Sequence, residues 1–215
     1  MKALIIQNSK ATPPGTTTSW LDQKNISYDI HFFSSGKKVS ADNYDLFFIC
    51  GGGMNVDQEE VYPWLTDEKN FIKDLIAKNK KIVGLCLGAQ LLAELLGGQV
   101  FKAPHWEAGW QNINLQNGKT LRAFEWHGYQ FISPPGSTVF AFNEACAHQS
   151  FTYGKNIIAF QFHPESTKEW IRERAEDEDA PPAGPYVQMK EEMLSELDQQ
   201  RQLQEWYFGQ LNTFL

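Results

Sequence analysis

The chain has 215 residues, of which 42% are hydrophobic, 13% aromatic and 21% charged. A chain of this length and composition can bury a complete core without metal ions or disulfides, which excludes wholesale disorder. The formal net charge is −7, and it is local, because residues 165–205 contain 12 acidic and five basic side chains while the rest of the chain is balanced. This acidity argues against a nucleic-acid binder, since such proteins usually carry a basic excess.

The sequence carries no sign of a membrane or secretory protein. No segment approaches the ~20 consecutive apolar residues that span a bilayer, and the apolar run at residues 3–6 is too short for a secretory signal. The three cysteines, Cys50, Cys86 and Cys146, are odd in number and have no CxxC spacing, so they indicate neither a disulfide framework nor a zinc site. We therefore expect a reducing, cytoplasmic setting.

Apolar runs alternate with helical patterns along the first 96 residues. Strands are expected at residues 2–7, 28–33, 44–50 and 81–86. Helices are expected at residues 19–24, at 66–79, where Thr66 can cap the N-terminus, and at 88–96, which two glycines end. This order predicts a single α/β domain with a mixed, mostly parallel sheet flanked by helices.

The sequence pattern changes twice in the rest of the chain, first to short strand-like runs and then to helices joined by a linker. Between residues 99 and 162, short runs of β-branched and aromatic residues predict further strands, some antiparallel, with the clearest at 157–162. A helix at 166–174 is followed by an acidic, Pro-rich linker at 176–185 and a last helix from about residue 186 to 215. We expect residues 1–175 to form the main domain. Residues 176–215 would form a linker and an amphipathic helix that packs on the core or, alternatively, on a partner.

The strongest local signal is the run GLCLGAQ at residues 84–90, in which a strand enters, a helix leaves and Cys86 lies at the tip. Small residues two positions before and after a nucleophile permit the sharp turn called a nucleophile elbow, which lifts the side chain above the sheet. The helix N-terminus favours the thiolate, which is the reactive form of cysteine. The alternative is a structural cysteine in a strand-to-helix turn.

A cysteine nucleophile needs a base. The sequence offers His31, His105, His127, His148 and His163. His163 is the best candidate, because it closes a predicted strand and would emerge at the same sheet edge as the elbow. Glu165 follows two residues later and can turn back to the imidazole, which fixes its tautomer and stabilises the imidazolium. Taken singly, His163 is also consistent with an ordinary strand-end histidine, and Glu165 with a helix cap.

Acyl transfer also needs an oxyanion site. Three glycines at residues 51–53 end a predicted strand whose last residues belong to the same sheet edge as Cys86. Glycines let the backbone approach a ligand closely, so one of their N–H groups and that of Leu87 are candidate oxyanion donors. A plain tight turn is the alternative. The run is not a dinucleotide fingerprint, because the GxGxxG spacing fails at Val56.

Together these segments resemble a known family. The glycine turn, the GLCLGAQ run, EAGW at residues 107–110 and FQFHPE at residues 160–165 occur in the order typical of class I (triad-type) glutamine amidotransferases. The resemblance covers roughly residues 1–175 and is greatest to the free-standing, GMP-synthase-like amidotransferase domains. It implies a flavodoxin-like catalytic domain over residues 1–175.

The resemblance also implies a mechanism and a set of site residues. Cys86 would attack the carboxamide carbon of glutamine, and His163, held by Glu165, would move the proton. Ammonia would leave, and water would release glutamate from a γ-glutamyl thioester. Gly52 and Leu87 would supply the oxyanion N–H groups. The substrate would contact Gly53, Gln90, His127, Gly128 and Tyr129.

One position departs from the family pattern. Related sequences carry a His-Gly-Asp segment whose aspartate helps to hold the α-amino group of the substrate, and here residues 127–129 read HGY. A phenol accepts a hydrogen bond but brings no charge at neutral pH. Tyr129 therefore leaves room for a γ-glutamyl compound other than glutamine, unless Glu125 or Glu107 supplies the charge.

Three functional hypotheses follow. The first is a glutamine amidase, with an ammonia-accepting synthetase as its partner. The second is a γ-glutamyl peptide hydrolase with the same triad, and the third is a non-catalytic binding module.

The GxxxxGK[ST] motif of ATP-binding loops does not occur. We expect no cofactor, metal, nucleic acid or membrane, since neither His105 with Glu107 nor His163 with Glu165 has a third ligand at metal spacing.

Overall fold

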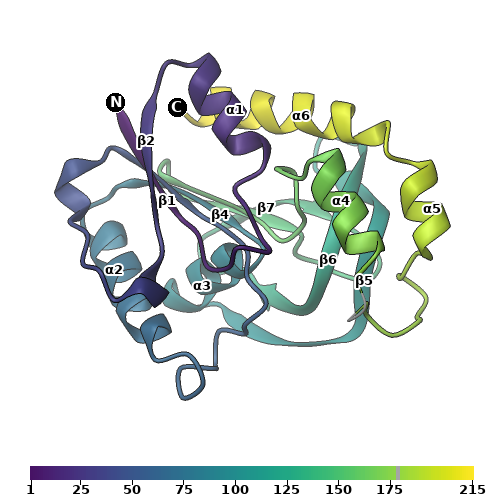
Figure 1. The fold of residues 1–215 in the computed structure, drawn as a ribbon, viewed down its shortest axis with the longest axis horizontal. Coiled ribbons are helices and arrows are strands. Elements are labelled where there is room, and N and C mark those ends of the chain that lie inside the picture. Colours follow the sequence, from purple (N-terminus) through teal and green to yellow (C-terminus); the bar gives the residue numbers. More distant parts are fainter. Residues whose placement is uncertain (178–179) are drawn as a thin grey trace.

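A nine-stranded sheet forms the centre of the molecule, in the order β2-β1-β3-β4-β9-β8-β7-β5-β6 (Figure 1). The computed structural model describes residues 1–177 and 180–215, so Glu178 and Asp179 of the predicted linker lie outside the described residues. The parallel strands are β1 (Lys2–Ile6), β2 (Ser27–His31), β3 (Leu46–Ile49), β4 (Lys81–Leu85) and β9 (Ile157–Phe160). The antiparallel strands are β5 (Gln99–Leu115), β6 (Thr120–Ile132), β7 (Thr138–Phe142) and β8 (Ser150–Tyr153). The prediction of a mixed sheet is confirmed.

Helices cover both faces of the parallel strands, which explains why these strands are apolar at consecutive positions. Along β1, Ala3 and Ile5 face one buried cluster, and Leu4 and Ile6 face the other. Helices α2 (Trp64–Ala77) and α3 (Leu87–Leu95) cover one face, and α1 (Thr16–Gln23), α4 (Lys168–Ala175) and α6 (Gln199–Phe214) cover the other (Figure 1). Two short 3-10 helices, Phe33–Ser35 and Ala41–Asn43, join β2 to β3. Helix α2 begins at Trp64, so Thr66 is not its cap.

The C-terminal segment folds onto the protein's own core. The sequence predicted one helix over about residues 186–215, but the structure has two, α5 (Lys190–Ser195) and α6, separated by a turn. The break lets Met193 of α5 and Tyr207 of α6 enter the same buried cluster. The Tyr207 hydroxyl also lies 3.0 Å from the hydroxyl of Thr17 on α1. The apolar face of the last helix therefore packs within the chain.

Strands β5 and β6 form a long hairpin where the sequence predicted several short strands. They contain 17 and 13 residues, with a shift of register between Lys102 and Glu107. The backbone of β6 lies beside the segment that follows β9. There the N–H of His163 donates a hydrogen bond to the carbonyl of Phe124 at 2.8 Å. The hairpin thus closes one side of the sheet edge at which β4 and β9 end.

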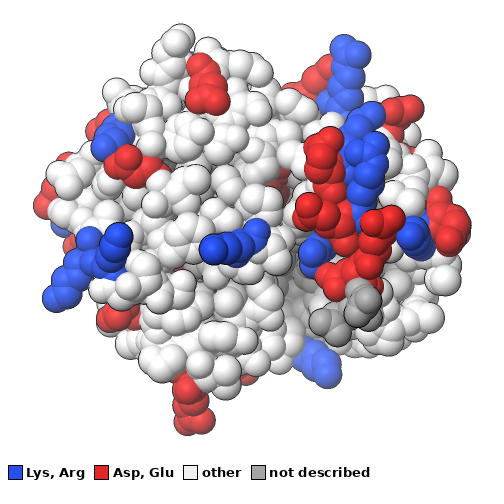
Figure 2. All heavy atoms as spheres, in the orientation of Figure 1, with Lys and Arg blue, Asp and Glu red and all other residues white. Residues whose placement is uncertain are grey.

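Charged side chains are unevenly spread over the surface. Acidic and basic groups gather over α4 and the segment that follows it, whereas the middle of the same face carries few charges (Figure 2). This is the region to which the sequence assigned the excess of acidic residues. Within the described residues, every helix is too short or too polar to cross a membrane.

Candidate active site

Cys86 occupies a strained turn between β4 and α3. Its backbone has φ 49° and ψ −108°, in the half of the Ramachandran map that non-glycine residues avoid. Such a conformation costs on the order of 1–3 kcal/mol and marks sites where the surrounding structure holds a residue in place. A Cβ atom at Gly88 would lie 2.1 Å from the carbonyl oxygen of Ile49, so only glycine lets α3 begin this close to β3. The predicted elbow is therefore present.

His163 follows the end of β9 and is held by Glu165. The Nδ1 atom of His163 lies 2.8 Å from a carboxylate oxygen of Glu165, and both side chains are buried. Glu165 does not cap the next helix, because the hydroxyl of Thr167 accepts the N–H of Trp170 instead, at 3.1 Å. The Trp170 ring packs on the imidazole, with ring centroids 4.7 Å apart. The imidazole is therefore fixed from two sides.

Cys86 and His163 face the same cavity of about 120 Å³, here called the Cys86 cavity. A Cβ atom at Gly51 would lie 3.3 Å from Cε1 of His163 and 3.4 Å from Cβ of Cys86, so both side chains border the same glycine. The wall of the cavity consists of Ser9, Ala11, Thr12, Gly52, Gly53, Cys86, Trp126, His163, Trp170 and Arg174.

The charge state of His163 follows from its neighbours. Burial disfavours the imidazolium, but the Glu165 carboxylate and the Cys86 sulfur outweigh burial and raise the pKa of His163 to about 10. At neutral pH the imidazole is therefore protonated.

The candidate oxyanion donors lie next to each other. A Cβ atom at Gly52 would meet the side chain of Leu87 at 2.9 Å, so the glycine turn after β3 touches the first residue of α3. Leu87 begins that helix, where N–H groups have no partner within the helix. The turn after β3 and the first residue of α3 therefore lie side by side next to Cys86.

Of the predicted substrate contacts, only Gly53 lines the Cys86 cavity. Gln90 is buried behind Cys86, where its amide nitrogen donates to the carbonyl of Tyr129 at 3.1 Å and to the side chain of Gln161 at 3.2 Å. Gln161 in turn donates to the sulfur of Cys86 at 3.8 Å. Gln161 was not predicted from the sequence, although it is the polar residue between two phenylalanines just before His163.

His127 does not line the Cys86 cavity, and its ring lies against a buried pair of carboxylates. Its Nε2 atom lies 3.0 Å from Glu125 and 3.3 Å from Glu107. Burial disfavours the charged ring, but Glu107 and Glu125 together hold the pKa of His127 well above its ordinary value. Burial, reinforced by Glu107, raises the pKa of Glu125 to about 7. Gly128 follows in the same strand, with Trp106 filling the space beside it.

This cluster corrects one expectation from the sequence. We expected no third ligand beside Glu107, yet the pairing of β5 with β6 places Glu125 and His127 there, with one ligand atom from each within 4.8 Å of the others. His105 stays outside the group and packs near Tyr186. Asn143 and Gln149 donate hydrogen bonds to Glu107 at 2.6 and 3.1 Å, so the carboxylate is also held by amides.

The comparison with known proteins agrees with this geometry. The sequence family described as glutamine amidotransferase class-I matches residues 18–174. The chain belongs to the class I glutamine amidotransferase family. The amidotransferase fold of the chain superimposes on the crystal structure of a glutamine amidotransferase from Methylobacillus flagellatus with a TM-score of 0.90 and 28% identity, covering 100% of this chain and 95% of that one.

Relatives of this amidotransferase chain include two kinds of enzyme. One subunit of the glutamine-hydrolysing GMP synthase of Sulfurisphaera tokodaii is 33% identical over 133 residues, which cover 57% of this chain and 68% of that protein. Gamma-glutamyl peptidase 2 of Arabidopsis thaliana is 28% identical over 145 residues, which cover 61% of this chain and 58% of that protein. The chain is therefore similar both to glutamine amidotransferases and to a γ-glutamyl peptidase.

Six wall residues of the Cys86 cavity were not predicted from the sequence, and three of them, Ser9, Ala11 and Thr12, belong to the loop after β1. Trp126 comes from β6, and Trp170 and Arg174 come from one face of α4, where they are four residues apart. Their spacing on a predicted helix was visible, but nothing in the sequence indicated that this face would point toward Cys86. The packing of Trp170 against His163 and against Phe124 of β6 decides it.

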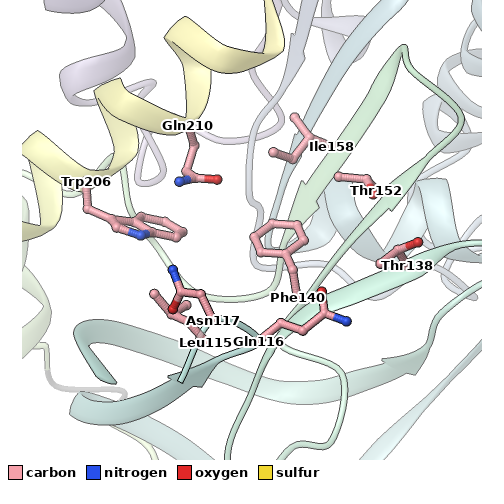
Figure 3. A pocket seen from close by; sticks show the side chains of 9 residues that line it. All are labelled: Leu115, Gln116, Asn117, Thr138, Phe140, Thr152, Ile158, Trp206 and Gln210. Atoms are coloured by element: carbon pink, nitrogen blue, oxygen red, sulfur yellow. The ribbon is translucent and has the colours of Figure 1, made fainter. Parts of the chain in front are cut away.

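A larger cavity of the amidotransferase chain lies elsewhere. It has a volume of about 600 Å³ and is bounded by side chains of α6 and of β7, β8 and β9, with Trp206, Gln210 and Phe140 turned into it (Figure 3). Neither Cys86 nor His163 contributes to its wall. Size therefore does not identify the reactive site in this protein, whereas the chemistry of the lining side chains does.

Proposed function

We propose that the chain hydrolyses the γ-amide of glutamine or of a related γ-glutamyl compound, with Cys86 as nucleophile. The observation that carries this proposal is the strained Cys86, which faces the same cavity as a protonated His163 held by Glu165. Membership of the amidotransferase family supports the same reaction class.

The proposed reaction has two halves. The sulfur of Cys86 attacks the amide carbon, and the N–H groups of Gly52 and Leu87 stabilise the oxyanion. The C–N bond then breaks, His163 gives its proton to the departing nitrogen, and a γ-glutamyl thioester remains. In the second half, His163 takes a proton from water, the hydroxide attacks the thioester, and glutamate and the thiolate are released. Glu165 orients the imidazole and stabilises its charge in both halves.

Labelling with the γ-glutamyl-directed electrophile diazo-oxo-norleucine tests this assignment. We expect one modified residue, Cys86, by peptide mass spectrometry, and loss of hydrolysis in the same proportion. Cys50→Ser and Cys146→Ser are the matched controls, because burial holds the pKa of both thiols above its ordinary value and both residues lie outside the Cys86 cavity. A label on Cys50 or Cys146, or full activity in Cys86→Ser, contradicts the proposal, whereas no hydrolysis of any γ-glutamyl compound by the wild type favours a non-catalytic binding module.

A second candidate function is γ-glutamyl peptide hydrolysis. Tyr129 stands where related sequences place an aspartate, which weakens the case for free glutamine as the sole substrate. The similarity to a γ-glutamyl peptidase supports this candidate. Turnover of glutamine and of a γ-glutamyl dipeptide, measured side by side on the isolated chain, separates the two substrates.

An ammonia-accepting synthetase partner is the third element of the proposal. It is supported by the similarity to the GMP synthase relative, which is named as one subunit of an assembly. For an ammonia donor we expect weak glutamine hydrolysis by the isolated chain. Full turnover of a γ-glutamyl dipeptide by the chain alone instead identifies a self-contained hydrolase, which needs no partner.

A further inference from the structure

A second cavity adjoins the Cys86 cavity. It has a volume of about 270 Å³ and shares two wall residues, Trp126 and Arg174, with the Cys86 cavity. The rest of its wall is mostly apolar and includes Pro181, Val187 and Met193. A water-sized molecule such as ammonia occupies only about 30 Å³. The second cavity is therefore far larger than the leaving group of glutamine requires.

The outer wall of this cavity is tied to the sheet. The N–H of Ala108 on β5 donates to the carbonyl of Tyr186, and the N–H of Gln188 donates to the carbonyl of Ala108, both at 3.0 Å. The side chain of Gln188 also accepts the N–H of Trp110 at 2.7 Å. Residues 186–188 thus run beside β5 like a short added strand. Hydrogen bonds to the sheet therefore fix this part of the cavity wall.

Arg174 lies where the two cavities meet. Its guanidinium stands between two indole rings, 6.0 Å from the ring centre of Trp126 and 5.9 Å from that of Trp170. One terminal nitrogen, Nη1, donates to Asp177. The Nε atom is buried and has no hydrogen-bond partner among the described residues. Because guanidinium groups bind carboxylates in a paired, two-bond geometry, this arrangement suits a carboxylate of the ligand.

The position of His163 decides which part of the substrate lies near Arg174. The departing nitrogen must lie beside the imidazole that protonates it. Trp170 packs on that imidazole, and Arg174 is one helical turn further along α4. The candidate oxyanion donors come from other segments, Gly52 from the turn after β3 and Leu87 from the start of α3. The second cavity therefore lies on the leaving-group side of the scissile bond.

We infer that the preferred substrates are γ-glutamyl peptides whose leaving amino acid has a free carboxylate, and that Arg174 binds this carboxylate. The side chain of the leaving amino acid occupies the second cavity. This inference rests on the proposed function, because it takes the thioester reaction at Cys86 as given. It assigns Arg174 a role in substrate specificity, while the amide C–N bond still breaks as described above and the amine leaves with the proton of His163.

The test compares γ-glutamyl-phenylalanine with its C-terminal amide, which lacks only the carboxylate charge. In the wild type we expect kcat/KM for the acid to exceed that for the amide by about 10- to 100-fold, the usual contribution of a charge-assisted hydrogen bond. In Arg174→Gln we expect the ratio to fall close to one. Arg174→Lys keeps the charge without the paired geometry and is expected to give an intermediate ratio.

The ratio cancels any loss of folding or general activity, because both substrates meet the same enzyme. Arg172→Gln is the matched control, since Arg172 lies on the same helix, is exposed and pairs with Glu169. We expect it to keep the wild-type ratio. A ratio near one in the wild type, or an unchanged ratio in Arg174→Gln, overturns the inference.

Failure of the inference differs from failure of the proposed function. If glutamine is hydrolysed and Cys86 is labelled but neither dipeptide is cleaved, the carboxylate subsite is wrong and the proposed function stands. If diazo-oxo-norleucine leaves Cys86 unmodified and neither glutamine nor the dipeptides are cleaved, the proposed function itself is wrong.

Discussion

At the scale of single residues, the contact between His163 and Glu165 sets the ionisation on which the proposed reaction depends. The pKa of His163 is raised to about 10 because the Glu165 carboxylate and the Cys86 sulfur outweigh burial. Above that pH the imidazole loses the proton that the leaving group needs. We therefore expect activity to persist through neutral pH and to decline only as the pH approaches 10, which a pH profile of kcat/KM checks.

Glu165→Gln tests this directly. Without the carboxylate charge the pKa of His163 falls, so the imidazolium is lost at a lower pH and the alkaline limb of kcat/KM moves downward. We also expect a loss of about 10²- to 10⁴-fold in kcat at neutral pH, the usual contribution of a positioned acid–base group. Steady-state kinetics across the pH range measures both effects, with the exposed Glu169→Gln as control. An alkaline limb that stays in place rules out this role for Glu165.

At the scale of elements, α6 belongs to the folded core and not to a separate surface. Leu203, Tyr207 and Leu211 are fully buried, and the indole nitrogen of Trp20 on α1 donates to Asn212 on α6 at 3.1 Å. The helix thus joins the two ends of the chain across one face of the sheet. A helix in this position contributes to stability even if no partner ever binds it.

Leu211→Ala measures that contribution. Removing a fully buried leucine side chain costs about 2–5 kcal/mol, from lost transfer free energy and the cavity left behind. We expect urea denaturation to show a loss in this range. Gln202→Ala, at an exposed position of the same helix, is expected to change stability by less than about 0.5 kcal/mol. A similarly small effect for Leu211→Ala indicates that α6 leaves the core in solution.

At the scale of the whole molecule, the cluster of Glu107, Glu125 and His127 connects the hairpin to the rest of the sheet. Glu107 also accepts hydrogen bonds from Asn143, after β7, and from Gln149, before β8. One buried carboxylate therefore holds together segments from four strands. None of the three side chains of the cluster lines the Cys86 cavity.

His127→Ala probes the strength of this connection. It leaves two buried carboxylates beside each other without a cation, and breaking a buried ion pair in this way costs about 3–5 kcal/mol. We expect a loss of this size in chemical denaturation at neutral pH. The control is His105→Ala, because His105 is exposed, and it is expected to have little effect. Equal stability of the two variants contradicts a structural role for the cluster.

How far the sequence determines the site depends on the range of the interactions. The grouping of Cys86, His163 and Glu165 could be predicted because they follow two parallel strands, β4 and β9. Parallel strands bring their ends to one edge of the sheet. Arg174 and the partners of His127 could not be found in this way. Their positions depend on the docking of α4 and on the register of β5 with β6, which arise only when distant segments pack.

The backbone at Cys86 has an evolutionary consequence. Because these dihedral angles suit glycine better than any residue with a Cβ atom, Cys86→Gly is the one substitution that relieves the backbone strain. A laboratory selection for heat resistance alone would therefore favour glycine at this codon. Glycine would also remove the proposed nucleophile, so thermal stability and the proposed turnover make opposite demands on this position.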